Sequence, residues 1–188
     1  MIAGGARALY RSVEGAEDEE SSGALAMVER GVKDTDVIIG ITASGRTPFV
    51  LGALAKAKSL GAKTILLTCN PSSVVAPKAF GAAAGTAAST ENVDLTITLA
   101  VGPEILTGST RLKAGTATKV ALNIISTGAM VALGKVRANL MIDLHASSSK
   151  LRDRATRVVS ELMNCDYDAA RQQLEAGGWD LRGVLGKL

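Results

Sequence analysis

The chain has 188 residues, of which 47% are hydrophobic and 21% are charged, and its formal net charge is +3. This composition can bury the core of about one domain, which excludes a disordered or fibrous chain. Aromatic residues make up only 3% of the sequence, and neither they nor Lys and Arg gather in one segment. Nucleic-acid binding is therefore not expected.

The two cysteines, Cys69 and Cys165, lie far apart and form no CxxC motif. We expect neither a disulfide framework nor structural zinc, and a reducing cytoplasm fits this cysteine usage. His145 is the only histidine, so we set aside a His-ligated metal and a Ser-His-Asp triad and expect no metal or cofactor. Because the longest apolar stretch, 120–133, is interrupted and shorter than a membrane span, we expect a soluble protein without a membrane partner.

Short runs rich in β-branched residues alternate with longer helical patterns, which is typical of β-α-β units and a parallel sheet. The predicted strands lie at 37–41, 64–68 and 95–99. A helix that begins at Pro48 and ends at Gly61 joins the first two strands. Further helices are expected at 22–29 and 112–133.

The remaining segments are smaller elements. Residues 80–90, dominated by Ala, Gly, Ser and Thr, have too little bulk to anchor a core and indicate an insertion or loop. A last strand is expected at 139–144. Three helices should follow it, at 148–163, from Asp166 to the break at Gly177, and at 179–185. We expect a domain boundary between 147 and 148.

The segment 43–48, with the sequence Ala-Ser-Gly-Arg-Thr-Pro, lies between a buried strand and the start of a helix. Ligands of open parallel sheets lie beyond the carboxyl ends of the strands, and helix N-termini attract anions. Ser44, Gly45 and Thr47 are therefore candidates for holding a phosphate, with hydroxyl donors and a backbone that a ligand can approach. The pattern alone leaves an ordinary capping loop equally open.

Two further polar segments are candidates. Residues 102–113 also lead from a strand into a helix and combine a carboxylate, three hydroxyls and two cations. Residues 13–18 hold three carboxylates, which taken alone most often form a solvated face.

Several motifs occur in the order found in the N-acetylmuramic acid 6-phosphate etherase family, and as a set the chain resembles that family. They are Ile-Ala-Gly-Gly at 2–5, Val-Glu-Gly-Ala-Glu-Asp at 13–18, Ala-Ser-Gly-Arg-Thr-Pro at 43–48, Cys-Asn-Pro at 69–71, Val-Gly-Pro-Glu at 101–104, Leu-Thr-Gly-Ser-Thr-Arg-Leu-Lys-Ala-Gly-Thr-Ala at 106–117, Gly-Lys-Val at 134–136 and Asn-Leu-Met at 139–141.

The resemblance implies the α/β fold of a sugar isomerase (SIS) domain, with a parallel sheet and a phosphosugar site at 1–147 and a small helical appendix at 148–188. The family cleaves the D-lactyl ether of N-acetylmuramic acid 6-phosphate to N-acetylglucosamine 6-phosphate and D-lactate in cell-wall recycling. This reaction is an elimination followed by addition of water, for which carboxylates can serve as acid and base without a metal.

The resemblance also assigns residues. Glu17 matches one of two catalytic glutamates of the family. The expected substrate contacts are Ser44, Gly45, Arg46, Thr47, Glu104, Ser109, Thr110 and Lys113. Because family members form dimers, a homodimer is expected as well.

The chain departs from the family at its beginning. It starts about a third of the way along the family's sequence, so the earlier Gly-Thr-Ser-Gly-Arg loop and the other catalytic glutamate are expected to be absent. The first strands of the sheet should be absent too, which would expose a sheet edge and apolar helix faces.

Two other functions remain open from the sequence. One is a phosphosugar sensor or regulator that keeps the fold without turnover, as the related glucokinase regulatory protein does. The other is a partner-binding role for the last helices, around Tyr167, Leu174 and Trp179, although such helices more often pack onto their own domain.

Overall fold

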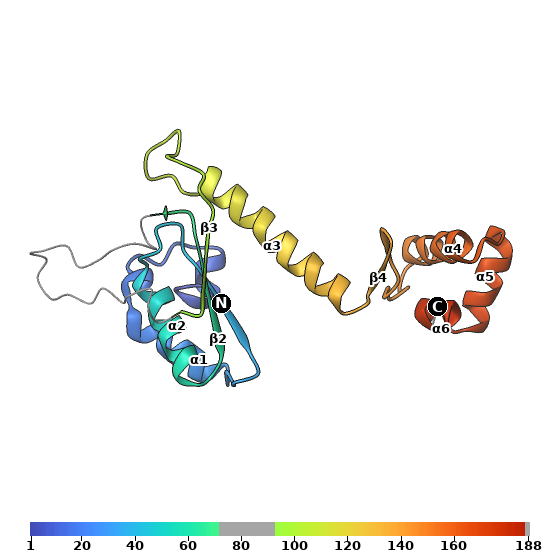
Figure 1. Ribbon diagram of the computed structural model, residues 1–188, viewed down its shortest axis with the longest axis horizontal. Helices are drawn as coiled ribbons and strands as arrows, with labels where there is room; N and C mark the ends of the chain where they lie inside the picture. Colours follow the sequence, from blue (N-terminus) through green and yellow to red (C-terminus); the bar gives the residue numbers. More distant parts are fainter. Residues whose placement is uncertain (72–92, 187–188) are drawn as a thin grey trace, which may run out of the picture. The chain divides into compact units, whose positions relative to one another are not determined.

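The computed structural model describes residues 1–71 and 93–186 (Figure 1). The chain divides into two compact units, Met1–Ala121 and Leu122–Leu188. This division falls inside helix α3, ahead of the domain boundary at 147/148 that the sequence predicts, and that boundary stays a prediction. The predicted Ala/Gly-rich insert lies outside the described residues.

The first unit is a parallel sheet with helices beside it (Figure 1). The sheet has the strand order β1-β2-β3, with Val37 opposite Lys63 and Ile65 opposite Leu95. The elements in chain order are η1 (Gly5–Leu9), η2 (Ala16–Asp18), α1 (Glu20–Glu29), β1 (Val37–Ile41), α2 (Pro48–Ser59), β2 (Lys63–Thr68), β3 (Leu95–Thr98) and the first part of α3 (Lys113–Ala132).

The core of this unit lies around the central strand β2. Leu66 and Leu67 point to opposite faces of the strand and are 0% and 1% exposed, as expected for a parallel strand covered on both sides. Helix α2 packs on β1 and β2, and α1 packs on α2. The strands predicted at 37–41, 64–68 and 95–99 and the helix beginning at Pro48 are thus confirmed. The strand at 37–41 is expected to be buried, but β1 is an edge strand of the described sheet, with Val37 57% exposed.

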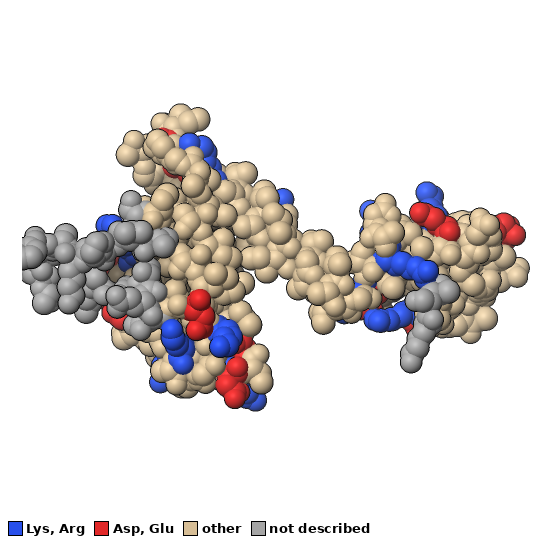
Figure 2. Space-filling model, in the orientation of Figure 1, with Lys and Arg blue, Asp and Glu red and all other residues tan. Residues whose placement is uncertain are grey.

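Helix α3 is exposed along most of its length. Ala114 is its only buried residue, while Val120, Ile124 and Val131 are 48%, 67% and 51% exposed. Its only charged residues are lysines, and the face of α3 seen in Figure 2 shows almost no charged atoms. The helix therefore presents apolar surface that the described residues do not cover.

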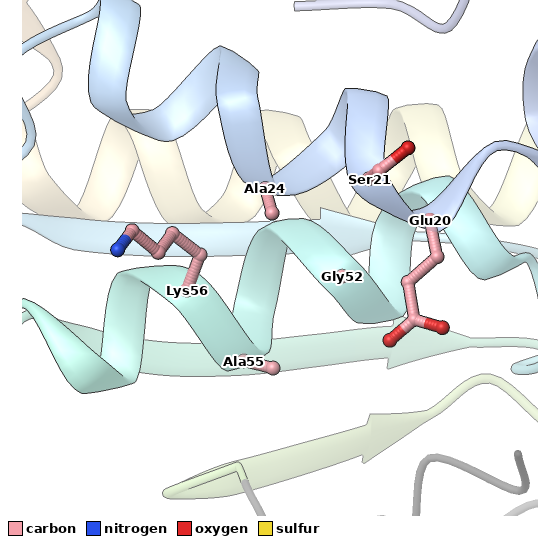
Figure 3. Close-up of a pocket in the computed structure, with 6 residues that line it drawn as sticks. All are labelled: Glu20, Ser21, Ala24, Gly52, Ala55 and Lys56. Carbon is pink, nitrogen blue, oxygen red and sulfur yellow. The ribbon is translucent and has the colours of Figure 1, made fainter.

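Two glycines allow α1 and α2 to approach each other closely. A Cβ atom added at Gly23 would lie 1.9 Å from the carbonyl oxygen of Phe49, and one added at Gly52 would lie 2.3 Å from that of Glu20. Figure 3 shows Gly52 on α2 next to the beginning of α1. Because both neighbouring atoms belong to backbone, this helix pair has no room for a side chain at either position.

A carboxylate connects the beginning of β3 to β2. Asp94 Oδ2 accepts hydrogen bonds from the Thr64 backbone N–H at 2.8 Å and from the Thr64 hydroxyl at 3.0 Å. The hydrogen bond from the Thr64 backbone is the main cause of a lowered pKa of Asp94, and the bond from the Thr64 hydroxyl adds to it. Burial opposes this effect, and the nearby Lys58 ammonium lowers the pKa further. The ionised form of Asp94 is therefore favoured in the folded state.

This lowered pKa predicts a loss of stability in acid. The contribution of Asp94 is complete above the carboxyl's ordinary, unfolded-state pKa and disappears as the pH falls through the lower folded-state value. We expect Asp94→Asn to destabilise the chain at pH 7 and to flatten its decline in stability below about pH 4. Urea unfolding measured from pH 7 to pH 3 checks this, with Asp34→Asn as the control at an exposed carboxylate. An unchanged acid slope in Asp94→Asn would contradict it.

The second unit is mostly helical. Besides the rest of α3 it contains β4 (Val136–Arg137), β5 (Leu140–Met141), α4 (Ser149–Met163), α5 (Tyr167–Ala176) and α6 (Leu181–Leu185). The Ser148 hydroxyl accepts from Leu151 N–H and the Asp166 carboxylate from Ala169 N–H, which confirms the predicted starts of α4 and α5. The helices enclose a core of Ala146, Ala155, Val158, Val159, Ala170, Leu174, Leu181 and Leu185.

The predicted strand at 139–144 is wrong in length. Only Leu140–Met141 is a strand, and it pairs antiparallel with β4 in a two-residue hairpin whose Ala138 has φ 52°. The apolar residues Leu140, Ile142 and Leu144 instead pack against the helical core. These alternate residues all lie on the side of the segment that faces the helices. The alternation of apolar residues is therefore present, although the segment does not form a long β-ladder.

Candidate functional site

The loop after β1 lies where the sequence places it, between the carboxyl end of a strand and the start of α2. Thr42 N–H donates to the Leu67 carbonyl at 3.1 Å, which continues the β1-β2 pairing by one residue. Gly45 has φ 73°, and its N–H donates to the Thr42 carbonyl at 3.2 Å. Gly45 is the last residue of the turn that this bond closes, and it has the left-handed backbone that glycine adopts without strain.

Three hydroxyl groups gather in this loop. Thr42 Oγ1 lies 2.7 Å from Thr47 Oγ1 and 3.2 Å from Ser44 Oγ, and Arg46 N–H donates to Ser44 Oγ at 3.2 Å. The three hydroxyls carry three protons, of which the two contacts among them use two. One hydroxyl proton therefore remains for a ligand at the N-terminus of α2, an arrangement that suits an anion.

Thr42 belongs to this hydroxyl cluster, although the sequence did not single it out. It is only 6% exposed and occupies the middle of the cluster. The available signal was a threonine directly after the apolar run of β1, where a polar side chain reaches the edge of the sheet.

The end of β2 holds the same loop through its backbone. The hydroxyl of Thr68 and the N–H of Cys69 both donate to the Ala43 carbonyl, each at 3.2 Å. The side-chain amide of Asn70 donates to the Ser44 carbonyl at 3.1 Å. The Cys69 thiol also lies 3.8 Å from the Ala114 carbonyl in the first turn of α3. The end of β2 thus contacts both candidate segments.

In the second candidate segment, Glu104 caps α3. Its two carboxylate oxygens accept the N–H groups of Lys113 and Ala114, each at 2.9 Å. The bond from Ala114 is the main cause of the lowered pKa of Glu104; burial opposes it, and the bond and the charge of Lys113 add to it. Both oxygens of this carboxylate are therefore engaged by the helix N-terminus.

The other predicted residues of this segment lie close to that capped helix. Ser109 is half-buried in a turn in which its N–H donates to the Leu106 carbonyl at 2.9 Å, and Thr110 is exposed. The Lys113 ammonium lies beside Gly102, where an added Cβ would be 3.9 Å from Nζ. Their substrate contacts remain predictions.

Glu17 lies on η2, which packs against α2. Its side chain is exposed and has no hydrogen bond or ion pair within the described parts of the chain. The 3-10 helix that carries Glu17 thus lies against α2, the helix that follows the hydroxyl cluster. The Glu17 carboxylate itself contacts no polar partner among the described residues. Its catalytic role remains a prediction.

Two hollows in the first unit lie away from these loops. One is the surface hollow between α1 and α2 shown in Figure 3, lined by residues that include Glu20 and Lys56. The other lies between η1 and α1 and is lined by residues that include Ile2, Leu25 and Phe49. Neither includes a predicted site residue.

Residues 1–71 and 93–186 contain neither a metal-binding cluster of side chains nor a membrane-spanning helix. No three His, Cys, Asp or Glu side chains there come together closely enough to hold a metal ion. No helix in that part combines the length and the apolar character required to cross a membrane.

Comparison with known proteins identifies relatives of the chain. Residues 1–58 match the family model of the glucokinase regulatory protein N-terminal SIS domain. Over 185 residues the chain is 49% identical to N-acetylmuramic acid 6-phosphate etherase of Gloeobacter violaceus, covering 98% of this chain and 56% of that protein. Over 182 residues it is 47% identical to the enzyme of the same name from Rhizobium rhizogenes, covering 97% of this chain and 55% of that protein.

These matches, together with the parallel sheet and its helices, confirm the α/β fold of an SIS domain. The chain is a relative of the N-acetylmuramic acid 6-phosphate etherases, with similarity along nearly its whole length. It spans about half the length of the curated relatives it matches.

Proposed function

We propose that this chain, a relative of the N-acetylmuramic acid 6-phosphate etherases, binds a phosphorylated amino sugar and acts in the lyase cleavage of its D-lactyl ether. The products would be N-acetylglucosamine 6-phosphate and D-lactate, within cytoplasmic amino sugar recycling. The relatives' shared name supports the reaction. The hydroxyl cluster after β1 carries the proposal, because it offers a proton to an anion at a helix N-terminus.

In this proposal the phosphate of the sugar binds to Ser44, Gly45, Arg46 and Thr47. The free proton of the hydroxyl cluster is donated to a phosphate oxygen, and the guanidinium of Arg46 supplies positive charge from the same loop. Gly45, which is buried, shapes the turn between Ser44 and Thr47 through its left-handed backbone.

The second segment holds the rest of the sugar. Ser109, Thr110 and Lys113 contribute two hydroxyls and an ammonium at the beginning of α3. Glu104 fixes the beginning of that helix, because its carboxylate accepts two backbone N–H groups there. We therefore propose that Glu104 acts by positioning Lys113.

Glu17 serves as acid or base. The reaction removes a proton from the carbon next to the aldehyde of the opened sugar, and the lactate oxygen leaves from the neighbouring carbon with the bonding electrons. Water then adds to the resulting double bond, so that a hydroxyl replaces the lactyl group. A carboxylate can take up the first proton and return one at a later step.

The partner of the chain in this proposal is a second copy. The exposed apolar face of α3 carries no acidic side chain and only two lysines, so two copies would meet there with little charge to desolvate.

We further assign the phosphosugar domain to residues 1–147 and the helical appendix to 148–188.

Incubation of the purified chain with N-acetylmuramic acid 6-phosphate, followed by a D-lactate assay, tests the activity. Release of D-lactate supports the lyase. Binding of the sugar phosphate without D-lactate would instead indicate a sensor. Absence of both would contradict the proposal.

Loss of hydroxyls should weaken binding of the phosphate. We expect Thr47→Ala and Ser44→Ala each to reduce the affinity for N-acetylglucosamine 6-phosphate about ten- to hundredfold, because each disrupts the hydroxyl cluster that offers its free proton to a charged group. Titration calorimetry measures this. Ser126→Ala on α3, whose hydroxyl bonds only its own helix, is the matched control. Equal affinities in all three variants would place the phosphate elsewhere.

A further inference from the structure

The backbone of the hydroxyl cluster after β1 accepts a hydrogen bond from Asn70, which follows the end of β2 at Thr68. Asn70 donates from its side-chain amide to the Ser44 carbonyl at 3.1 Å, across 26 positions of sequence. Its own backbone N–H donates to the Thr68 hydroxyl at 3.2 Å, and Thr68 is 1% exposed. The backbone of Asn70 is thus anchored to the buried end of β2, while its side-chain amide contacts the loop after β1.

We propose that Asn70 is a positioning residue for phosphosugar binding, which orients the Ser44–Gly45 peptide and through it the hydroxyl cluster. This inference rests on the proposed function. The Ser44 carbonyl and the Gly45 N–H belong to one planar peptide, so a donor that fixes the carbonyl also fixes the N–H. The φ of 73° at Gly45 then sets the direction in which Arg46 and Thr47 leave the turn.

The side chain of Ser44 stands next to that peptide. It accepts the Arg46 N–H and contacts the Thr42 hydroxyl, so rotation of the peptide would change both contacts. Because the hydroxyl cluster has only one proton to spare, a change in these contacts redirects the donor that a phosphate needs.

The exposure of this region indicates that the bond acts on geometry more than on stability. Ser44 is exposed and Asn70 is half-buried, so water can replace the lost donor at the Ser44 carbonyl. An exchange of that kind costs little free energy of unfolding. Water cannot, however, fix the direction of the carbonyl as a side chain anchored to β2 does.

The test compares Asn70→Ala and Asn70→Leu with Asn123→Ala, a control on an exposed part of α3. We expect both Asn70 variants to bind N-acetylglucosamine 6-phosphate about tenfold more weakly by calorimetry, with the unfolding midpoint within about 2 °C of wild type. In the ligand-free chain, the amide NMR resonance of Gly45 should shift in both Asn70 variants and stay in place in the control.

Each outcome decides a separate point. Unchanged affinity in the Asn70 variants, or an unmoved Gly45 resonance, would overturn the inference. A large drop in the unfolding midpoint would make Asn70 a structural residue and would overturn it as well. If wild type binds no sugar phosphate while the Gly45 resonance moves only in the Asn70 variants, the proposed function fails and the positioning of the loop by Asn70 stands.

Discussion

Replacement of Gly23 by alanine is expected to destabilise the first unit by about 3 kcal/mol, at the upper end of what overpacking costs. The new Cβ would lie 1.9 Å from the carbonyl oxygen of Phe49, which is backbone and cannot turn aside as a side chain would. The helices α1 and α2 must separate to admit it, and the buried residues between them, Met27, Ala53 and Ala57, lose contact. Urea unfolding followed by far-UV circular dichroism measures the loss.

The control for this prediction is Gly128→Ala in α3. An added Cβ at Gly128 meets nothing within 4 Å, so the substitution should gain about 0.8–1.0 kcal/mol from helix propensity alone. The two substitutions are chemically identical and both lie in helices, and they should therefore change stability in opposite directions. Equal stabilities would mean that α1 and α2 are not packed as closely as described.

Replacement of Glu17 by glutamine is expected to lower the rate of D-lactate release by about 10²- to 10⁴-fold, the usual contribution of a general acid or base. Glutamine has nearly the same shape, but it neither accepts nor returns a proton at working pH. Because Glu17 is exposed and makes no hydrogen bond or ion pair in the described residues, its loss should leave the unfolding free energy nearly unchanged.

Glu29→Gln at the end of α1 is the matched control, because this exposed glutamate has no assigned role. D-lactate release and the affinity for N-acetylglucosamine 6-phosphate are measured for both variants and wild type. A Glu17→Gln rate within threefold of wild type would remove Glu17 from the mechanism. Sugar phosphate binding that survives Glu17→Gln, with no D-lactate from either form, would support the sensor.

The elements with strong local signals could be predicted from the sequence. β1 has the predicted bounds, α2 begins at Pro48, and the N-caps Ser148 and Asp166 start their helices as expected. In each case the signal lies within a few residues of the feature it determines, as a β-branched run, a first-turn proline or a capping side chain. The loop after β1 was located in the same way.

The contacts inside the candidate site could not be predicted in this way. The role of Thr42 depends on two hydroxyls further along the same loop, and that of Asn70 on a carbonyl 26 positions earlier. Glu104 resembles a ligand-binding carboxylate in sequence, yet it caps a helix that begins nine positions later. Such contacts follow from strand pairing and loop closure, which a pattern of residue types does not specify.

The dependence of the β1 loop on the end of β2 also determines when this loop can take its native form. Parallel strands need a crossover connection, here through α2, and such non-local contacts are costly in chain entropy. Until β2 docks beside β1, the carbonyls of Ala43 and Ser44 lack the donors that fix them. A ligand that recognises the fixed loop would therefore bind only molecules that have finished this step, and its binding free energy would add directly to their resistance to unfolding.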